Sequence, residues 1–335
     1  MKIAFFEIQN WERDILSKVF RGQELMFFTT PLNEFNIDKI READALSIFI
    51  YSKIDKKILD KLPNLKYITT RSMGFDHIDL EECKSRKIKV SNAPHYGDNS
   101  VAEHTFGLIL SLSRNIHKAL IRTLDKNYKI EGLKGFDLKG KTLGVVGTGR
   151  IGSHVVKIAS AFEMNVLAVD HNPRRELRKY CKFVSMNELL RKSDIITLHV
   201  PFCKDNFHLI NKVALSKVKK GALLVNTSRG PVVDTKALLW ALENNILLGV
   251  GLDVLEGEEL IKEEKELLHD LKKLNLEKMR QLAIDHRILH DERVVFTPHI
   301  AFYTEEAVQK ILGTTIENIK AFMKGRAINT VQCLT

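Results

Sequence analysis

A glycine-rich turn between an apolar run and a helix-like stretch constrains this chain more than any other feature. The turn is Gly147-Thr148-Gly149-Arg150-Ile151-Gly152, which follows the run Thr142–Val146 directly and precedes a stretch that begins at Ser153. In this pattern the first glycine permits the tight bend, the second lets a pyrophosphate approach the backbone, and the third lets helix and strand pack closely. The N–H groups at the start of the helix would face the phosphates. The turn therefore predicts a βαβ unit that binds a dinucleotide.

An acidic residue after the next apolar run strengthens this prediction. Asp170 follows the run Asn165–Val169 and lies about twenty residues after the middle glycine, where a ribose-binding acid is expected. Its carboxylate would accept hydrogen bonds from the ribose hydroxyls and repel a 2′-phosphate, which favours NAD over NADP. Arg174 and Arg175 oppose that preference, because a nearby arginine accommodates NADP.

Apolar runs alternate with helical stretches along the whole chain, which favours an α/β fold with parallel sheets. The 335 residues are enough for two domains. We expect both to be doubly wound parallel-sheet domains, one a Rossmann NAD domain with six strands and the other flavodoxin-like. The predicted strands are Lys2–Phe6, Leu46–Tyr51, Leu65–Thr70 and Lys87–Val90, then Thr142–Val146, Asn165–Val169, Ile195–Val200, Ala222–Asn226, Leu248–Leu252 and Arg293–Phe296.

Two capping patterns locate helix starts. Ser100 and Glu103 are spaced as a reciprocal capping box, which predicts a long helix that begins there and joins the two domains. Ser185 and Glu188 repeat the pattern and predict a helix between the second and third strands of the second series.

A charged, leucine-rich segment at about residues 259–291 predicts a helical insert. We interpret it as a lid or a packing element without chemistry of its own. Its leucines at helical spacing are Leu260, Leu267, Leu271, Leu274 and Leu282.

Composition favours an ordinary cytoplasmic protein. The formal charge of +10 comes from 52 basic residues interleaved with 42 acidic ones, so a lysine-rich soluble surface is favoured over nucleic-acid binding. Glu7 interrupts the first apolar run too early for a signal peptide, and no run reaches the roughly 18 apolar residues of a membrane span. We expect reduced thiols and no metal, because the cysteines lie far apart at Cys83, Cys181, Cys203 and Cys333.

The segment Gly135–Thr142 also satisfies the G-x-x-x-x-G-K-[ST] pattern of nucleotide triphosphatases. A true P-loop follows a strand and opens a helix, whereas this segment follows polar residues and opens a strand. We therefore reject an ATP site here.

Three ionisable residues stand just beyond predicted strands of the second series, at the edge where open α/β sheets bind ligands. Arg229 follows Asn226-Thr227-Ser228, Glu258 follows Asp253-Val254-Leu255-Glu256-Gly257, and His299 follows Thr297-Pro298. Each of these types alone is more often a surface ion pair or a structural histidine, so their combination carries the prediction.

At these positions the sequence resembles the D-2-hydroxyacid dehydrogenase family, and within it the NAD-dependent D-lactate dehydrogenases. The resemblance covers nearly the whole chain. It is carried by Arg71-Ser72-Met73-Gly74-Phe75-Asp76-His77-Ile78-Asp79, by Tyr96 ahead of Ser100-Val101-Ala102-Glu103-His104-Thr105, by the glycine turn, and by His299-Ile300-Ala301-Phe302-Tyr303-Thr304.

The resemblance implies roles for the three residues. Arg229 would clamp the substrate carboxylate and polarise its carbonyl, a task that suits the planar guanidinium. His299 would act as acid and base while the nicotinamide delivers hydride. Glu258 would hydrogen-bond the ring, favour its protonated form and fix its orientation.

The resemblance also implies the remaining contacts and the domain arrangement. Residues 1–99, completed by 300–335, would form the substrate domain, residues 100–299 the NAD domain, and the active site would lie in the cleft between them; relatives are commonly homodimers. The substrate would be held by Met73, Gly74, Tyr96 and Arg229. The cofactor would be held by Gly147, Gly149, Arg150, Ile151, Gly152, Asp170, Val200, Pro201, Asn206, Thr227, Ser228 and Asp253, the last at the nicotinamide amide.

One departure concerns the substrate loop, where Gly97-Asp98 replace the more usual Ser-Pro after Tyr96. We interpret His95 in this loop as an exposed residue rather than a substrate contact.

Phe302-Tyr303 after the histidine favour a small, partly apolar substrate such as pyruvate over phosphoglycerate. A larger 2-keto acid, such as the precursor of 2-hydroxyisocaproate or hydroxypyruvate, remains an alternative, because a methylene changes binding by only about 1–3 kcal/mol. A second alternative is a non-catalytic, NAD-sensing corepressor-like protein.

Overall fold

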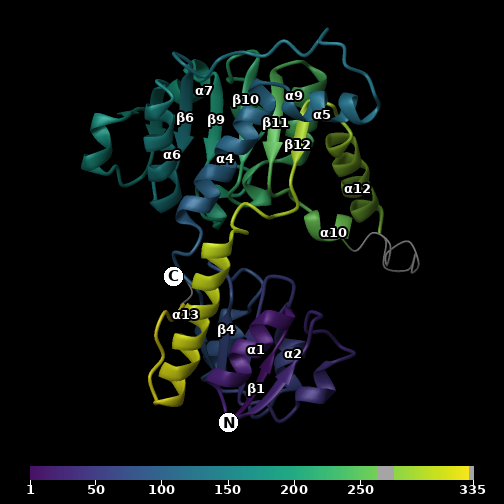
Figure 1. Ribbon diagram of the computed structural model, residues 1–335, viewed down its shortest axis with the longest axis vertical. Coiled ribbons are helices and arrows are strands. Elements are labelled where there is room, and N and C mark those ends of the chain that lie inside the picture. Colours follow the sequence, from purple (N-terminus) through teal and green to yellow (C-terminus); the bar gives the residue numbers. More distant parts are fainter. Residues whose placement is uncertain (263–274, 332–335) are drawn as a thin grey trace. The chain divides into compact units, whose positions relative to one another are not determined.

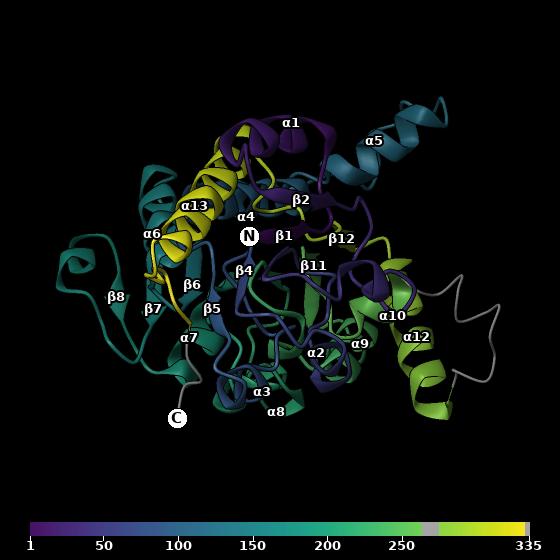
Figure 2. The same ribbon diagram turned by 90° about the horizontal axis from the view of Figure 1, so that it is seen from below.

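Parallel strands and their covering helices form two units in the computed structural model of the chain, which describes residues 1–262 and 275–331. One unit comprises Met1–Tyr96 together with the chain from Thr304 onward, and the other is the continuous segment Gly97–Tyr303. Each unit contains its own parallel sheet (Figure 1 and Figure 2).

The first unit has five parallel strands in the order β2-β1-β3-β4-β5. Strands β3 and β4 are buried along their whole length, since helices cover both faces of the sheet. The bounds are β1 Lys2–Phe5, β2 Glu24–Phe27, β3 Ala45–Ile48, β4 Tyr67–Thr70 and β5 Lys89–Ser91.

Helices from both ends of the chain cover one face of this sheet. Leu16 and Phe20, in and just after α1, pack with Leu312 and Ile319 of α13 on the strand residues of that face, and Figure 2 shows α1 beside α13. The bounds are α1 Asn10–Val19, η1 Ile37–Ile40, α2 Lys56–Asp60, α3 Leu80–Ser85 and α13 Glu305–Met323.

The second unit has seven parallel strands in the order β12-β11-β10-β9-β6-β7-β8. From β6 the chain adds strands toward one edge of the sheet, and from β9 it adds them toward the other edge. Doubly wound folds bind dinucleotides at this point, where the strand order reverses. The bounds are β6 Thr142–Val146, β7 Asn165–Val169, β8 Lys182–Phe183, β9 Ile195–Leu198, β10 Ala222–Asn226, β11 Leu247–Leu252 and β12 Val294–Phe296.

Helices α4 and α6 cover one face of this sheet through Phe106, Leu108 and Val155, and Figure 1 shows α4 crossing it. The other face packs against α7, α8, α9 and α12. The bounds are α4 Asp98–Ser113, α5 Ile116–Leu124, α6 Arg150–Ala161, η2 Arg175–Lys179, α7 Met186–Lys192, η3 Lys204–Asn206, α8 Lys212–Leu215, η4 Gly230–Val232, α9 Thr235–Glu243, α10 Glu258–Lys262 and α12 Leu276–Leu289.

The predicted α/β class with two parallel sheets is confirmed. Two edge strands, β2 and β8, were not predicted, because one begins with a charge and the other has only two residues.

Helix α7 begins as predicted, with Glu188 N–H donating to the Ser185 hydroxyl at 3.2 Å. The rejected ATP segment has no strand before it and leads into β6, as argued from its sequence.

The prediction that Ser100 caps the long helix is wrong. Helix α4 begins at Asp98, and Gly97 is its N-cap, with its carbonyl accepting from Val101 N–H at 3.0 Å. The acidic Asp98 suits the first turn because it faces the positive end of the helix dipole.

The insert is helical where it is described, in α10 and α12, whereas Leu267, Leu271 and Leu274 lie outside the described residues. Across the described parts of the chain, no helix is both long and apolar enough to span a bilayer.

Candidate active site

The predicted site residues of the second unit gather at one edge of its sheet. Gly147 follows β6, Asp170 follows β7, Val200 follows β9, Arg229 follows β10 and Asp253 follows β11. In a parallel sheet all these carboxyl ends lie at the same edge, so the loops that carry them are neighbours.

The glycine turn has the geometry that its sequence predicts. Gly147 has φ +90°, and a Cβ on it would lie 2.6 Å from the His199 carbonyl oxygen of β9's loop. A Cβ on Gly152 would overlap the Gly147 carbonyl, so helix α6 can approach β6 only with glycine there. Gly149 is the N-cap of α6 and has no atom within 4 Å of its Cβ position. That open space beside a helix N-terminus fits a pyrophosphate.

Asp170 fastens the turn to the next strand. Its Oδ2 accepts from Thr148 N–H at 2.6 Å and from the Thr148 hydroxyl at 2.8 Å, and its Oδ1 accepts from Asn172 N–H at 2.8 Å. Partial burial works to raise the pKa of Asp170, but these hydrogen bonds outweigh it and hold the pKa below its ordinary value. The group is therefore an ionised carboxylate at neutral pH, and Oδ1, which accepts one hydrogen bond, keeps a further lone pair for a ribose hydroxyl.

The two residues between Gly149 and Gly152 have different surroundings. Arg150 Nε donates to Asp98 Oδ2 at 2.5 Å, which holds the guanidinium near the start of α4, while Ile151 packs against the core under α6. Arg174 lies with Arg150 around a polar hollow beside α6. Asp98 thus fixes the direction of a cationic side chain at the glycine turn.

A tight turn presents Arg229 after β10. Asn226 Oδ1 accepts from Ser228 N–H at 3.0 Å and from the Ser228 hydroxyl at 2.7 Å, and Asn226 Nδ2 donates to the Arg229 carbonyl at 2.9 Å. Thr227 is buried, with its hydroxyl 2.9 Å from the Thr105 hydroxyl of α4. Sequence reasoning missed Asn226, although its amide organises the whole turn.

Glycine also brings the Arg229 loop against the loop that carries Glu258. A Cβ on Gly230 would overlap the backbone of Leu255 and Glu256. Because Gly230 directly follows the guanidinium residue, the two backbones approach at the point where both loops carry a predicted catalytic side chain.

The structure brings His299 and Glu258 together. His299 Nδ1 lies 3.0 Å from Glu258 Oε1, and both side chains are about one-fifth exposed. An ionised carboxylate only accepts, so Nδ1 is the donor and Nε2 is left as the nitrogen that can exchange a proton with a ligand. His299 adopts the left-handed backbone conformation, with φ +57°, which is uncommon for a residue other than glycine.

Asp253 holds the loop that imposes this backbone conformation. Its buried carboxylate accepts from Ile300 N–H and Ala301 N–H, each at 2.9 Å, and from the Thr297 hydroxyl at 2.6 Å. His104 Nε2 lies 2.9 Å from the same Thr297 hydroxyl, which links α4 to the loop. The Asp253 carboxylate therefore fixes the His299 loop, a role that its sequence position did not reveal.

The segment after β9 carries three further candidate cofactor residues. Asn206 Nδ2 donates to the Pro201 carbonyl at 2.9 Å, which closes the turn after β9, and Val200 packs against the sheet core.

One group of side chains could in principle ligate a metal ion: the nitrogen or oxygen atoms of His208, Asp234 and Glu256 that could serve as ligands lie within 4.8 Å of one another. His208 Nε2 donates to Glu256 Oε1 at 2.8 Å, and Asp234 caps α9 by accepting from Lys236 N–H and Ala237 N–H, so we interpret these side chains as structural.

In the first unit, the predicted substrate contacts form a compact cluster. Met73 N–H donates to the Tyr96 hydroxyl at a long 3.4 Å, and Asn92 Nδ2 donates to the Met73 carbonyl at 2.8 Å. The Ser72 hydroxyl donates to the Gly74 carbonyl at 2.6 Å, which directs the turn. His95 is exposed in the loop before Tyr96, as its interpretation requires.

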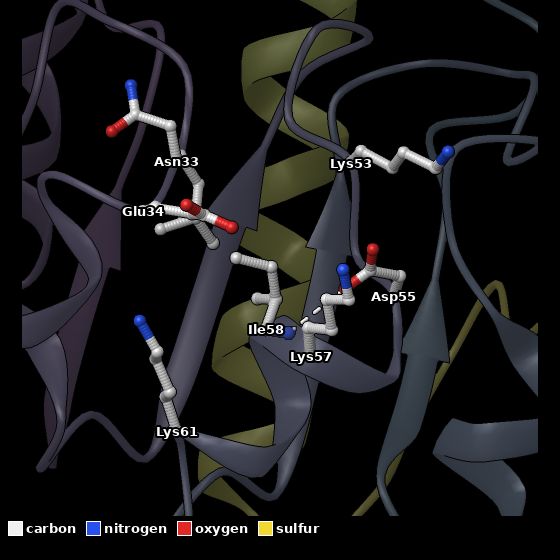
Figure 3. Close-up of a pocket in the computed structure, with 8 residues that line it drawn as sticks. Asn33, Glu34, Lys53, Asp55, Lys57, Ile58 and Lys61 are labelled. Atoms are coloured by element: carbon white, nitrogen blue, oxygen red, sulfur yellow. Dashed lines mark hydrogen bonds between the residues drawn. The ribbon is translucent and has the colours of Figure 1, made fainter. Parts of the chain in front are cut away.

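A shallow hollow in the first unit lies away from these residues (Figure 3). Lys53, Lys57 and Lys61 surround it with Glu34 and Asp55, and the Asp55 carboxylate caps α2 by accepting from Ile58 N–H at 3.0 Å. No predicted site residue lines it.

Comparison with known proteins agrees with this geometry. Residues 106–301 match the family described as D-isomer specific 2-hydroxyacid dehydrogenase, NAD binding domain. The chain belongs to this family, and it is an NAD-dependent oxidoreductase that acts on the CH–OH group of D-2-hydroxy acids.

Within the family, several similar proteins are D-lactate dehydrogenases. The chain is 36% identical to D-lactate dehydrogenase of Escherichia coli over 97% of this chain and 98% of the relative. It is 41% identical to a glyoxylate reductase of Thermofilum pendens over 88% of this chain and 83% of the relative. The crystal structure of D-lactate dehydrogenase from Aquifex aeolicus, complexed with NAD and lactic acid, has a TM-score of 0.87 and 37% identity, covering 96% of each chain.

Proposed function

We propose that this chain is a D-lactate dehydrogenase, which converts pyruvate, NADH and a proton into D-lactate and NAD⁺. The observation that carries the proposal is the His299–Glu258 pair, with 3.0 Å between Nδ1 and Oε1, at the carboxyl edge of an NAD-binding sheet. The similarity to D-lactate dehydrogenases from Escherichia coli and Aquifex aeolicus supports the choice of pyruvate.

In the proposed reaction, His299 Nε2 donates a proton to the keto oxygen of pyruvate and takes it back in the reverse direction. Glu258 keeps the ring oriented and stabilises its charged form through Nδ1. Arg229 binds the substrate carboxylate with two parallel hydrogen bonds and draws electron density from the carbonyl. Bound NADH supplies the hydride that the keto carbon accepts.

Binding of the cofactor is proposed to use the residues of the glycine turn and the neighbouring loops. Gly147, Gly149, Arg150, Ile151 and Gly152 would surround the pyrophosphate. Asp170 would bind the ribose hydroxyls, and the pocket would be completed by Val200, Pro201, Asn206, Thr227, Ser228 and Asp253. Met73, Gly74 and Tyr96 of the first unit are proposed as further substrate contacts.

The test is the loss of NADH absorbance on addition of pyruvate, compared with 2-ketoisocaproate, hydroxypyruvate and glyoxylate under the same conditions. We expect the largest kcat/KM with pyruvate and a product that is the D-isomer. A larger kcat/KM for another keto acid would assign the enzyme to that substrate, and tight NADH binding without turnover would reject the catalytic proposal.

We also propose that the protein is a homodimer. Helix α5 has no buried residue, and a run of apolar side chains on it and after it is 51–80% exposed, an area that calls for a covering partner. A second copy of the chain is the proposed partner. These side chains are Ile116, Leu120, Ile121, Leu124, Tyr128 and Ile130. Light scattering should give twice the chain mass, and Leu120→Glu should lower it; a monomeric wild type would reject the dimer.

A cytoplasmic location is proposed as well. Cys181 and Cys203 are free thiols, which suits a reducing compartment, and burial raises the pKa of the Cys181 thiol to about 11, so it is unreactive. Cell fractionation would test this location.

A further inference from the structure

The turn that leads into Glu258 packs against helix α12 of the insert. Gly257 has φ +81°, and a Cβ on it would lie 3.0 Å from Gln281 Cγ and 3.2 Å from Asp285 Oδ2. Because Glu258 is the first residue of α10, the direction of its backbone is set by this turn. Contacts made by α12 at Gly257 therefore bear directly on where the Glu258 carboxylate lies.

The side-chain amide of Gln281 links three parts of the chain at this point. Its Nε2 donates to the Thr235 hydroxyl at 3.0 Å and to Asp285 Oδ1 at 2.8 Å, and it lies 3.4 Å from the Glu256 carbonyl oxygen. Thr235 begins α9, directly after the loop that carries Arg229. One amide thus joins the insert to the loops that follow β10 and β11.

Glu256 extends this linkage to a fourth segment. Its Oε2 accepts from the Thr235 hydroxyl at 3.2 Å, and its Oε1 accepts from His208 Nε2 at 2.8 Å. The Thr235 hydroxyl therefore receives a hydrogen bond from Gln281 and passes one to Glu256. Chains of hydrogen bonds of this kind rigidify the loops they join.

Asp285 leaves Gln281 little freedom to move. The Asp285 side chain is fully buried, and in the described part of the chain its Oδ2 has no hydrogen-bond partner. Burial raises the pKa of Asp285 to about 7, the hydrogen bond from Gln281 opposes this, and the charge of Glu256 adds to it. Releasing Gln281 would leave the buried Oδ1 unpaired as well, which is costly.

We propose that Gln281 is a positioning residue for Glu258: its amide fixes the Glu256–Gly257 turn so that the Glu258 carboxylate meets the His299 ring. The inference deepens the proposed function and rests on it, because the catalytic role of the pair is part of that proposal. The insert thereby contributes to the reaction, because the hydrogen bonds of Gln281, which we call the brace, hold the acid–base pair in place.

The test uses Gln281→Met, which keeps the length of the side chain and removes its donors, with Arg280→Met on the exposed side of the same helix as the matched control. We expect Gln281→Met to lower kcat with pyruvate about ten- to hundredfold, the scale of a small misplacement of a catalytic group. The KM for NADH and the far-UV spectrum should not change, and the control should match wild type.

A double-mutant cycle separates positioning from general destabilisation. In a Glu258→Gln background, Gln281→Met should change kcat by no more than about twofold, because it acts through a carboxylate that is no longer there. An equal loss of kcat in both backgrounds, or no loss in either, would overturn the proposal. If Gln281→Met fails to fold, Gln281→Asn, whose shorter amide cannot span the same acceptors, serves in its place.

A measurement without substrate keeps this inference separate from the proposed function. The ¹⁵N chemical shift of His299 Nδ1 reports its hydrogen bond to Glu258, and in Gln281→Met it should move toward its value in Glu258→Gln. An unchanged shift would refute the brace even in an active enzyme. If wild type reduces no 2-keto acid but the shift moves as expected, the proposed function fails and the brace stands.

Discussion

Replacement of Asp285 by asparagine should remove a pH-dependent cost from the stability of the NAD-binding unit. Burial raises the pKa of this carboxyl from 3.8 to about 7, so the folded protein holds a proton that the unfolded chain releases between these values. The contribution of this carboxyl to the free energy of unfolding is fully present below about pH 4. It is lost as the pH rises to about 7, by about 1.36 kcal/mol per pH unit. Between pH 5 and pH 8 the wild type therefore loses about 3 kcal/mol that Asp285→Asn does not lose.

The assay is thermal unfolding of both proteins at pH 5 and pH 8 in buffers of equal ionic strength. For a unit of this size about 3 kcal/mol corresponds to about 6–12 °C in Tm. The Tm difference, variant minus wild type, should therefore be larger by that amount at pH 8 than at pH 5. Asparagine keeps an oxygen that accepts from Gln281, so the variant should fold and retain activity. A Tm difference that is the same at both pH values would refute the reasoning, since it would mean that Asp285 is not a buried acid.

Three further substitutions test the site. His299→Asn, chosen because asparagine tolerates the left-handed backbone, should lower kcat by about 10²–10⁴-fold while the Kd for NADH measured by fluorescence stays within about twofold; near-normal turnover would remove His299 from the mechanism. Asp170→Ala should weaken the preference for NADH over NADPH, measured as the ratio of the two kcat/KM values, and an unchanged ratio would contradict its ribose role. Gly152→Ala should lower Tm and abolish NADH binding, because its methyl group would overlap the Gly147 carbonyl; binding of wild-type strength would show that the turn can shift.

Much of the NAD-binding unit could be predicted from local pattern. Strands β6, β7 and β10 have the predicted bounds, because buried parallel strands are continuous apolar runs that end at turn residues. Strands β2 and β8 lack that signal, because β2 begins with a charged residue and β8 has only two residues. The start of α4 was misplaced because a glycine N-cap leaves no side-chain signature, while Ser100 imitates one.

The candidate site divides in the same way. Arg229, Glu258 and His299 could be proposed because they follow predicted strands in a recognisable order, and the structure shows the last two paired. The residues that hold them could not be proposed. Asn226 acts through hydrogen bonds within its own turn, whose geometry the residue spacing does not show, and Gln281 acts through contacts with segments distant in sequence.

The two ends of the chain share one small core, which sets an order of events during synthesis. Leu312 and Ile319 of α13 are buried against strands from the first seventy residues, and Val331 N–H donates to the Val90 carbonyl at 3.0 Å beside β5. One face of the N-terminal sheet therefore stays uncovered until α13 has emerged from the ribosome. The NAD-binding unit is continuous and consists of residues that emerge before α13, so it can fold first. Nascent chains stalled with α13 still inside the ribosomal exit tunnel should accordingly bind NADH while their first hundred residues are still open to protease.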